Sequence, residues 1–149
     1  MGAKMYALGE VAPQLKCVHE VVKCDFADVR PFAKVAAREH TCVKDSAGKE
    51  WFCIRHNGGM VVAFYGLTLS KSNARFSSNY THPDFRRRGC LAAFIEHAKA
   101  YAAERGCGKL TAFASAMSAP SHLRHGAVAD GQVNGATFVV YDLRKPKEK

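Results

Sequence analysis

The chain has 149 residues, enough for one domain with a substantial core, since domains commonly run to about 100–200 residues. Hydrophobic residues make up 48% and charged residues 23% of it, which is ordinary for a globular protein; no apolar run approaches the roughly 18 residues of a membrane-spanning helix, so we expect no membrane partner. The net charge of +9 favours anionic partners, which include phosphate-bearing cofactors, nucleic acid and acidic surfaces.

The first quarter of the chain predicts a strand followed by a helix. Valines and cysteines mixed with polar residues favour a strand at Leu15–Cys24. Apolar residues recur at helical spacing over Phe26–His40, which predicts a helix. Asp25 is its expected N-cap, and Pro31 has to lie in its first turns.

Three extended segments follow. Trp51–Arg55 and Met60–Leu69 are rich in strand-forming residues, and the His-Asn-Gly-Gly sequence at 56–59 between them is a hairpin signal. Ala74–Thr81 is the third extended segment, and His82-Pro83 closes it. We therefore expect these segments to form neighbouring strands.

The second half predicts helices alternating with strands. Gly89–Arg105 carries one apolar stripe at spacings of three and four residues and is the strongest helix prediction. Lys109–Ala114 reads as a strand, Ser118–His125 as a short helix and Thr137–Leu143 as a last strand. The whole order predicts a mixed α/β or α+β fold forming one domain over 1–149, in which about 144–149 is a basic flexible tail.

A basic loop joins the third extended segment to the strongest helix. It contains Arg86, Arg87 and Arg88, followed by Gly89 where the helix begins. Backbone N–H groups at a helix start have no intrahelical acceptor, and the helix dipole adds partial positive charge, so this is an anion site. Gly89 lets the backbone approach a phosphate closely, and the arginines add charge.

This segment resembles the central motif of the GNAT superfamily of N-acetyltransferases, in which a strand and a proline precede Arg/Gln-x-x-Gly-x-Gly/Ala. Arg86, Gly89 and Leu91 stand at the three defining positions, and Leu91 replaces the usual Gly or Ala, as in a divergent member. The resemblance spans roughly residues 15–143. It implies a mainly antiparallel sheet, flanked by helices, with a V-shaped splay between Ala74–Thr81 and Lys109–Ala114 that admits a pantetheine arm.

The resemblance also implies acetyl-CoA, or another acyl-CoA, as the cofactor. The acyl group would pass by direct attack to an amine of a protein, a peptide or a small molecule. The implied cofactor-binding residues are Tyr80, Thr81, Arg86, Arg87, Arg88, Gly89, Cys90 and Leu91. A backbone N–H near Tyr80 or Thr81 would polarise the thioester carbonyl. Arg86 is the arginine expected to contribute most, because it stands at the family's Arg/Gln position.

The acid that protonates the leaving thiolate has several candidates. The family often carries a Tyr four residues before a Gly-Phe pair, and here His122 precedes Gly126-Ala127 at that spacing. An imidazolium can donate a proton to sulfur, so His122 is a candidate acid. Ser118 and Ser121 are alternative donors. A surface histidine without a catalytic role is the other interpretation of His122.

The general base is less defined. The family's usual Glu on the fourth strand is missing, because 76–79 reads Phe-Ser-Ser-Asn. Water relayed from Ser78, Tyr80 or His82 could replace that carboxylate. His40, at the end of the first predicted helix, is a further candidate on the acceptor side.

Other functions remain open. Cys90 lies in the first turn of a helix, where a thiolate is stabilised, so a Cys–His acyl-enzyme is conceivable. A faint resemblance to Mom-type phage DNA-modifying proteins, around Glu39-His40-Thr41 and the Arg86–Gly89 loop, fits a nucleic-acid partner. The missing Glu and Tyr, together with Leu91, fit a degenerate member that binds a partner without catalysis. Many relatives pair, so a homodimer is possible.

Six cysteines bear on the compartment and on metal binding. They stand at positions Cys17, Cys24, Cys42, Cys53, Cys90 and Cys107. No two form a Cys-x-x-Cys pair, so we expect no metal site. We expect free thiols in a reducing, cytoplasmic setting, and residues 1–5 do not read as the start of a signal peptide.

Overall fold

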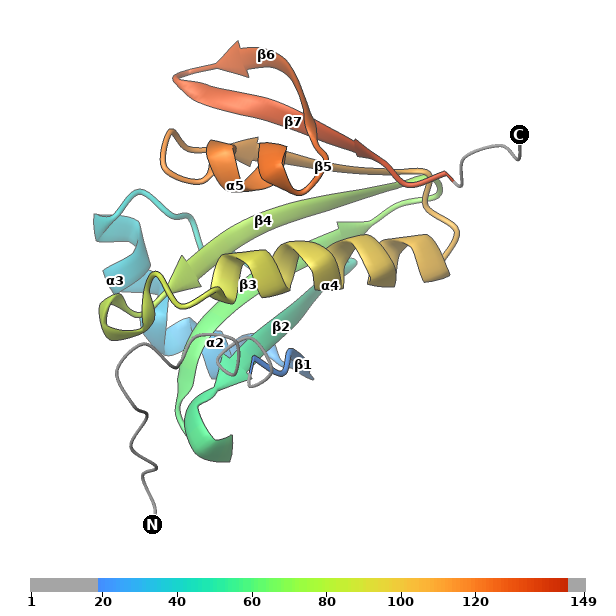
Figure 1. The fold of residues 1–149 in the computed structure, drawn as a ribbon. Helices are drawn as coiled ribbons and strands as arrows, with labels where there is room; N and C mark the ends of the chain where they lie inside the picture. The colour runs from blue at the N-terminus through green and yellow to red at the C-terminus, as the bar shows by residue number, and fades with distance from the viewer. Residues whose placement is uncertain (1–18, 145–149) are drawn as a thin grey trace, which may run out of the picture.

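The computed structural model describes residues 19–144, which form a seven-stranded sheet with helices on both faces (Figure 1). The strand order is β1-β2-β3-β4-β5-β7-β6, and all neighbours are antiparallel except β4 and β5, which are parallel. The strands are β1 (Val22–Cys24), β2 (Lys49–Arg55), β3 (Val61–Leu69), β4 (Asn73–Thr81), β5 (Lys109–Ala114), β6 (Val128–Val133) and β7 (Ala136–Asp142). The predicted fold class, mixed α/β (α+β) with a mainly antiparallel sheet, is confirmed.

The helices divide between the two faces of the sheet (Figure 1). They are α2 (Phe26–Val29), α3 (Ala33–Arg38), α4 (Cys90–Glu104) and α5 (Ala119–Arg124). Helix α4 buries Phe94 and Ile95 in the larger apolar core, together with Leu110 of β5. Helices α2 and α3 belong to a second apolar cluster on the opposite face, where Val29 packs with Trp51.

The first predicted helix, Phe26–His40, is broken into pieces. Asp25 and Asp28 form a capping box at the start of α2, but the helix ends after one turn. A 3-10 turn at Arg30–Phe32 holds Pro31, and α3 then begins at Ala33. Pro31 has no N–H to donate and its ring crowds the preceding turn, so a continuous α-helix cannot pass through it. The predicted strand Leu15–Cys24 is reduced to β1, and its residues 15–18 lie outside the described part of the chain.

Strand β6 is an element that the sequence analysis missed. It pairs only with β7, and all six of its residues are exposed. Its sequence, Val-Ala-Asp-Gly-Gln-Val, contains the strand-disfavouring Asp130 and Gly131 and no regular apolar alternation. The strand exists because β7 offers it a hydrogen-bonding partner.

The predicted splay is present between the two central strands. Strand β4 pairs with β5 only from Asn73–Lys109 to Phe76–Ala112, although β4 continues to Thr81. Beyond Phe76, the edge of β4 that faces β5 loses its ladder partner. Such an edge presents backbone N–H and C=O groups to whatever fills the gap.

Cys24, Cys42, Cys53, Cys90 and Cys107 are all free thiols, and Cys17 lies outside the described residues. In the part of the chain that the structure describes, no helix is long and apolar enough to cross a membrane.

Candidate active site

The start of helix α4 has the geometry of an anion site. Gly89 is the N-cap residue, with φ +89, and no side chain caps the helix. The first N–H groups of the helix, from Cys90 onward, therefore keep their donors available. A residue with a Cβ is strained at such a φ, so the loop needs glycine at this position. Arg87, two residues earlier, also has a left-handed φ of +64.

The three arginines of the loop have different surroundings. The Arg86 guanidinium donates to the Thr81 carbonyl at 2.8 Å and to the Glu39 carboxylate at 2.6 Å. It therefore fastens the loop to the end of α3. Arg88 lies over the ring of Phe85, with 5.4 Å from the guanidinium carbon to the ring centroid.

Leu91 and Cys90 point inward from the first turn of α4. Leu91 is partly buried and packs against the main core, so its side chain leaves the backbone N–H accessible. Cys90 is buried, with its Sγ 3.9 Å from the Phe85 carbonyl. Burial raises the pKa of the Cys90 thiol, which disfavours the thiolate that nucleophilic catalysis needs.

Strand β4 carries a β-bulge beside the splay. The register with β3 shifts between Phe64 and Gly66, so Ser78 and Asn79 together oppose one residue of β3. Ser78 takes a left-handed φ of +56, and its hydroxyl donates to the Cys42 carbonyl at 2.6 Å. Asn79 Oδ1 is buried without a hydrogen-bond partner, which marks it as an acceptor available to a ligand.

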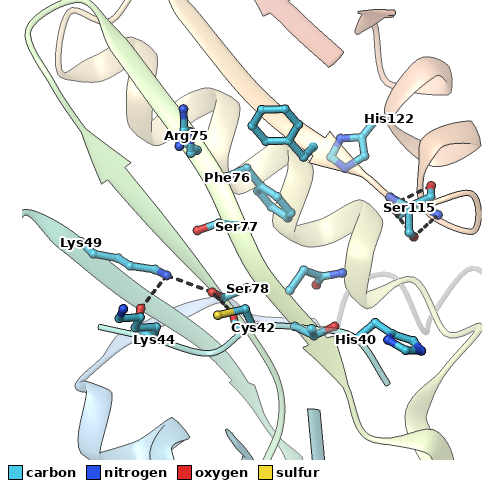
Figure 2. A pocket seen from close by; sticks show the side chains of 14 residues that line it. His40, Cys42, Lys44, Lys49, Arg75, Phe76, Ser77, Ser78, Ser115 and His122 are labelled. Carbon is cyan, nitrogen blue, oxygen red and sulfur yellow. Dashed lines mark hydrogen bonds between the residues drawn. The ribbon is translucent and has the colours of Figure 1, made fainter. Parts of the chain in front are cut away.

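A cavity of about 380 Å³ opens beside the bulge. Figure 2 shows Lys49 and Cys42 on one side of β4 and His122 with Ser115 on the other, while His40 lies near the end of the strand. The lining residues are His40, Thr41, Cys42, Lys44, Lys49, Arg75, Phe76, Ser77, Ser78, Asn79, Phe113, Ser115, Ser118 and His122. Three of the four predicted catalytic residues, namely His40, Ser118 and His122, are thus brought to one cavity.

His122 is buried, contrary to the interpretation as a surface histidine. Its exposed fraction is 2%, and its ring packs edge-on against Phe76 with centroids 5.4 Å apart. His122 Nδ1 lies 2.6 Å from the Tyr141 hydroxyl. Burial, and then the charge of His125, lower the pKa of His122 to about 4. The imidazole is therefore neutral at physiological pH, and any proton it passes on comes from the neutral ring.

Ser118 has a hydroxyl that is already part of a local network. Its Oγ accepts from the Ser115 N–H at 3.0 Å, while Ser115 Oγ accepts from the Ser118 N–H at 3.2 Å. The two hydroxyl oxygens lie 3.2 Å apart. Both side chains are fixed at the wall of the cavity where α5 begins.

Tyr80 has its side chain outside this cavity lining. The ring belongs to the second apolar cluster, and the hydroxyl donates to Glu39 at 3.5 Å. Burial, and then the charge of Glu39, raise the pKa of Tyr80, which keeps the phenol protonated. The backbone of Tyr80 and Thr81 still lies on the β4 segment beyond the pairing with β5.

Several residues near the site were not predicted from the sequence. Lys49 and Arg75 line the cavity, and His19 contacts the Arg88 carbonyl beside Gly89. The glycine in the middle of strand β3, Gly66, was the available signal, because such a glycine often marks a close approach. Among the described residues, no cluster of His, Cys, Asp or Glu could hold a metal ion.

Comparisons with known proteins identify the family. The sequence profile of the Acetyltransferase (GNAT) family matches residues 15–125, so the chain belongs to this acetyltransferase family. No curated protein sequence matches the chain.

Solved structures share the fold at low sequence identity. An aminoglycoside 6'-N-acetyltransferase complexed with coenzyme A is 8% identical, with a TM-score of 0.72 over 87% of this chain and 99% of its own. A ribosomal-protein alanine N-acetyltransferase from Escherichia coli is 15% identical, with a TM-score of 0.67 over 87% of this chain and 97% of its own. A GNAT acetyltransferase from Staphylococcus aureus is 9% identical, with a TM-score of 0.66 over 84% and 99%. These likenesses concern the fold alone.

Proposed function

We propose that the chain is an acyl-CoA-dependent N-acyltransferase, with acetyl-CoA as the donor and an amine as the acceptor. One observation carries the proposal. The unpaired edge of β4 leads from the cavity towards an uncapped helix start that carries arginines. The two features together suit a long thioester with a polyanionic end.

The residues present fit such a cofactor. Gly89 has no side chain between the backbone and a phosphate, and the N–H groups of Cys90 and Leu91 are free of intrahelical acceptors. Arg87 and Arg88 add positive charge at the same place. The β4 segment 77–81 has backbone groups that can pair with the amides of a pantetheine arm.

The chemistry that the cofactor supplies is a thioester carbonyl, and the protein supplies position and protons. A backbone N–H of β4 near Tyr80 or Thr81 would polarise the carbonyl oxygen. The amine nitrogen forms the new C–N bond as the C–S bond breaks, the amine loses a proton, and the thiolate gains one. Ser118 and neutral His122, both on the cavity wall, are the candidate donors to sulfur. The imidazole of His40, which lines the cavity on the acceptor side, can accept the amine proton.

Turnover tests the proposal directly. Purified protein with acetyl-CoA and a panel of amines is expected to release free thiol in proportion to acylated amine. The panel should contain amino acids, aminosugars, polyamines and peptides with a free N-terminus. Acetyl-CoA binding without thiol release across the panel would favour the degenerate, partner-binding alternative.

Neutralising Arg86 is expected to weaken acetyl-CoA binding by about 0.5–2 kcal/mol, the range between an exposed ion pair and a charge-assisted bond. We assign Arg86 a positioning role, because its guanidinium donates to the Glu39 carboxylate and to the Thr81 carbonyl. Arg86→Gln and Glu39→Gln should therefore lower the affinity by similar amounts in calorimetric titrations.

The two variants separate positioning from direct phosphate contact. A loss in Arg86→Gln with none in Glu39→Gln would assign the guanidinium to the phosphate itself. Arg87→Gln serves as the matched control for charge, because any loss it causes should shrink as salt rises.

A further inference from the structure

The cavity beside the β4 bulge gathers positive charge. Lys44, Lys49 and Arg75 line it, and none of the described residues of the lining is an aspartate or a glutamate. The only imidazoles among the described lining residues are those of His40 and His122. An amine acceptor that is itself polycationic would be repelled by such a wall.

The position of Lys49 depends on Gly66. A Cβ at Gly66 would stand 2.3 Å from Lys49 Cε, so any other residue there would displace the end of this side chain from its present path across strand β3. The ammonium then lies 4.4 Å from the centroid of the Trp51 ring. It donates to the Ser78 hydroxyl and to the Lys44 carbonyl, each at 2.9 Å (Figure 2). The Lys49 side chain therefore extends from β2 to the bulge of β4.

The partners of Lys49 are uncharged. Among residues 19–144, no carboxylate lies within ion-pair distance of its ammonium, whereas Lys23, Arg86 and Lys99 each have one. The carboxylate of Asp45, whose charge acts on Lys49, accepts a hydrogen bond from Trp51 Nε1 at 2.9 Å. Burial lowers the pKa of Lys49. A half-buried ammonium without a counter-ion costs free energy, and an anionic ligand would offset that cost.

We propose that this cavity binds the acyl acceptor, and that the acceptor is a small amine carrying a carboxylate or a phosphate, which Lys49 binds with help from Arg75. The assignment as the acceptor site rests on the proposed function. The anion preference rests on Lys49, Gly66 and the absence of acidic residues from the described lining. A cavity of about 380 Å³ suits a small molecule.

Product amides test the proposal without cofactor. The probes are two matched pairs, N-acetylglycine with N-acetylglycinamide, and phosphorylated N-acetylethanolamine with N-acetylethanolamine. NMR titration of the free protein should show the anionic member of at least one pair binding about tenfold or more tightly, as one charge-assisted hydrogen bond predicts. The pair with the larger difference in affinity shows whether the site prefers a carboxylate or a phosphate.

Three variants locate the anion. Lys49→Met should abolish the preference for the anionic member of the probe pair. Gly66→Ala should do the same by displacing the lysine side chain while leaving its charge in the protein. Lys71→Met, an exposed lysine outside the cavity lining, is the matched control and should retain the preference.

Several outcomes would overturn the inference. The first two are equal affinities for the two members of both pairs, and no binding of either anionic probe at tens of millimolar. The other two are tighter binding of monoacetylspermidine than of the anionic probes, and a preference for the anionic member that survives Lys49→Met. Anion binding through Lys49 in a protein that does not bind acetyl-CoA would support this inference and refute the proposed function. A failure of this inference can therefore be distinguished from a failure of the proposed function.

Discussion

Gly89→Val is expected to abolish acetyl-CoA binding, with a loss of about a hundredfold or more in affinity. The proposed phosphate contacts are several charge-assisted hydrogen bonds, each worth about 1.5–3 kcal/mol. The new side chain would stand where the backbone has to meet the phosphate. It would also strain the N-cap of α4, where φ is +89 and a β-branched residue is rarely tolerated.

A second variant separates the blocked approach from the backbone strain. Asparagine accepts a left-handed φ better than valine, so Gly89→Asn should keep α4 intact and still place a side chain at the phosphate site. We expect both variants to lose binding in calorimetric titrations, while circular dichroism confirms that Gly89→Asn is folded. Undiminished affinity in a folded Gly89→Asn or Gly89→Val protein would place the cofactor elsewhere.

His122 is expected to make the protein less stable in mild acid. Its pKa is about 4 in the folded protein and about 6.5 in the unfolded chain, so the unfolded state binds more protons between these values. The free energy of unfolding should therefore rise with pH across this window and fall as pH drops from about 6.5 to about 4. The contribution is about 2–3 kcal/mol when integrated over the window.

Urea unfolding at pH 7 and at pH 4.5 measures this contribution. His122→Gln keeps an acceptor for the Tyr141 hydroxyl but removes the titrating ring, so it should lose about 2 kcal/mol of the difference between the two pH values. His56→Gln, which changes an exposed imidazole, is the control and should keep the difference. An unchanged difference in His122→Gln would mean that this ring titrates in the folded protein as it does in the unfolded chain.

The loop at Arg86–Gly89 and helix α4 could be predicted because their signals are local. The apolar stripe of Gly89–Arg105 and the glycine at its start specify the helix without help from the rest of the chain, and the structure places α4 at Cys90–Glu104. The break in Phe26–His40 was also readable in principle. Pro31 is a local signal of that break, but the apolar spacing on both sides of the proline predicts one helix.

The proposed acceptor side could not be predicted from the sequence, because it depends on contacts between residues that are far apart in the chain. Lys49 reaches the cavity because its side chain passes over Gly66 and ends at the bulge of Ser78. A glycine inside a strand indicates a close approach at Gly66, but the sequence does not tell which side chain approaches it. The burial of His122 on α5 also depends on residues far away in the chain, namely Phe76 of β4 and Tyr141 of β7.

A crystal structure of the protein with acetyl-CoA tests the central claim most directly. We predict a pyrophosphate at the N–H groups that follow Gly89, and a pantetheine arm between β4 and β5. The acyl group should lie at the cavity that His122 and Lys49 line. A cofactor bound on another surface, or none at saturating acetyl-CoA, would contradict the account.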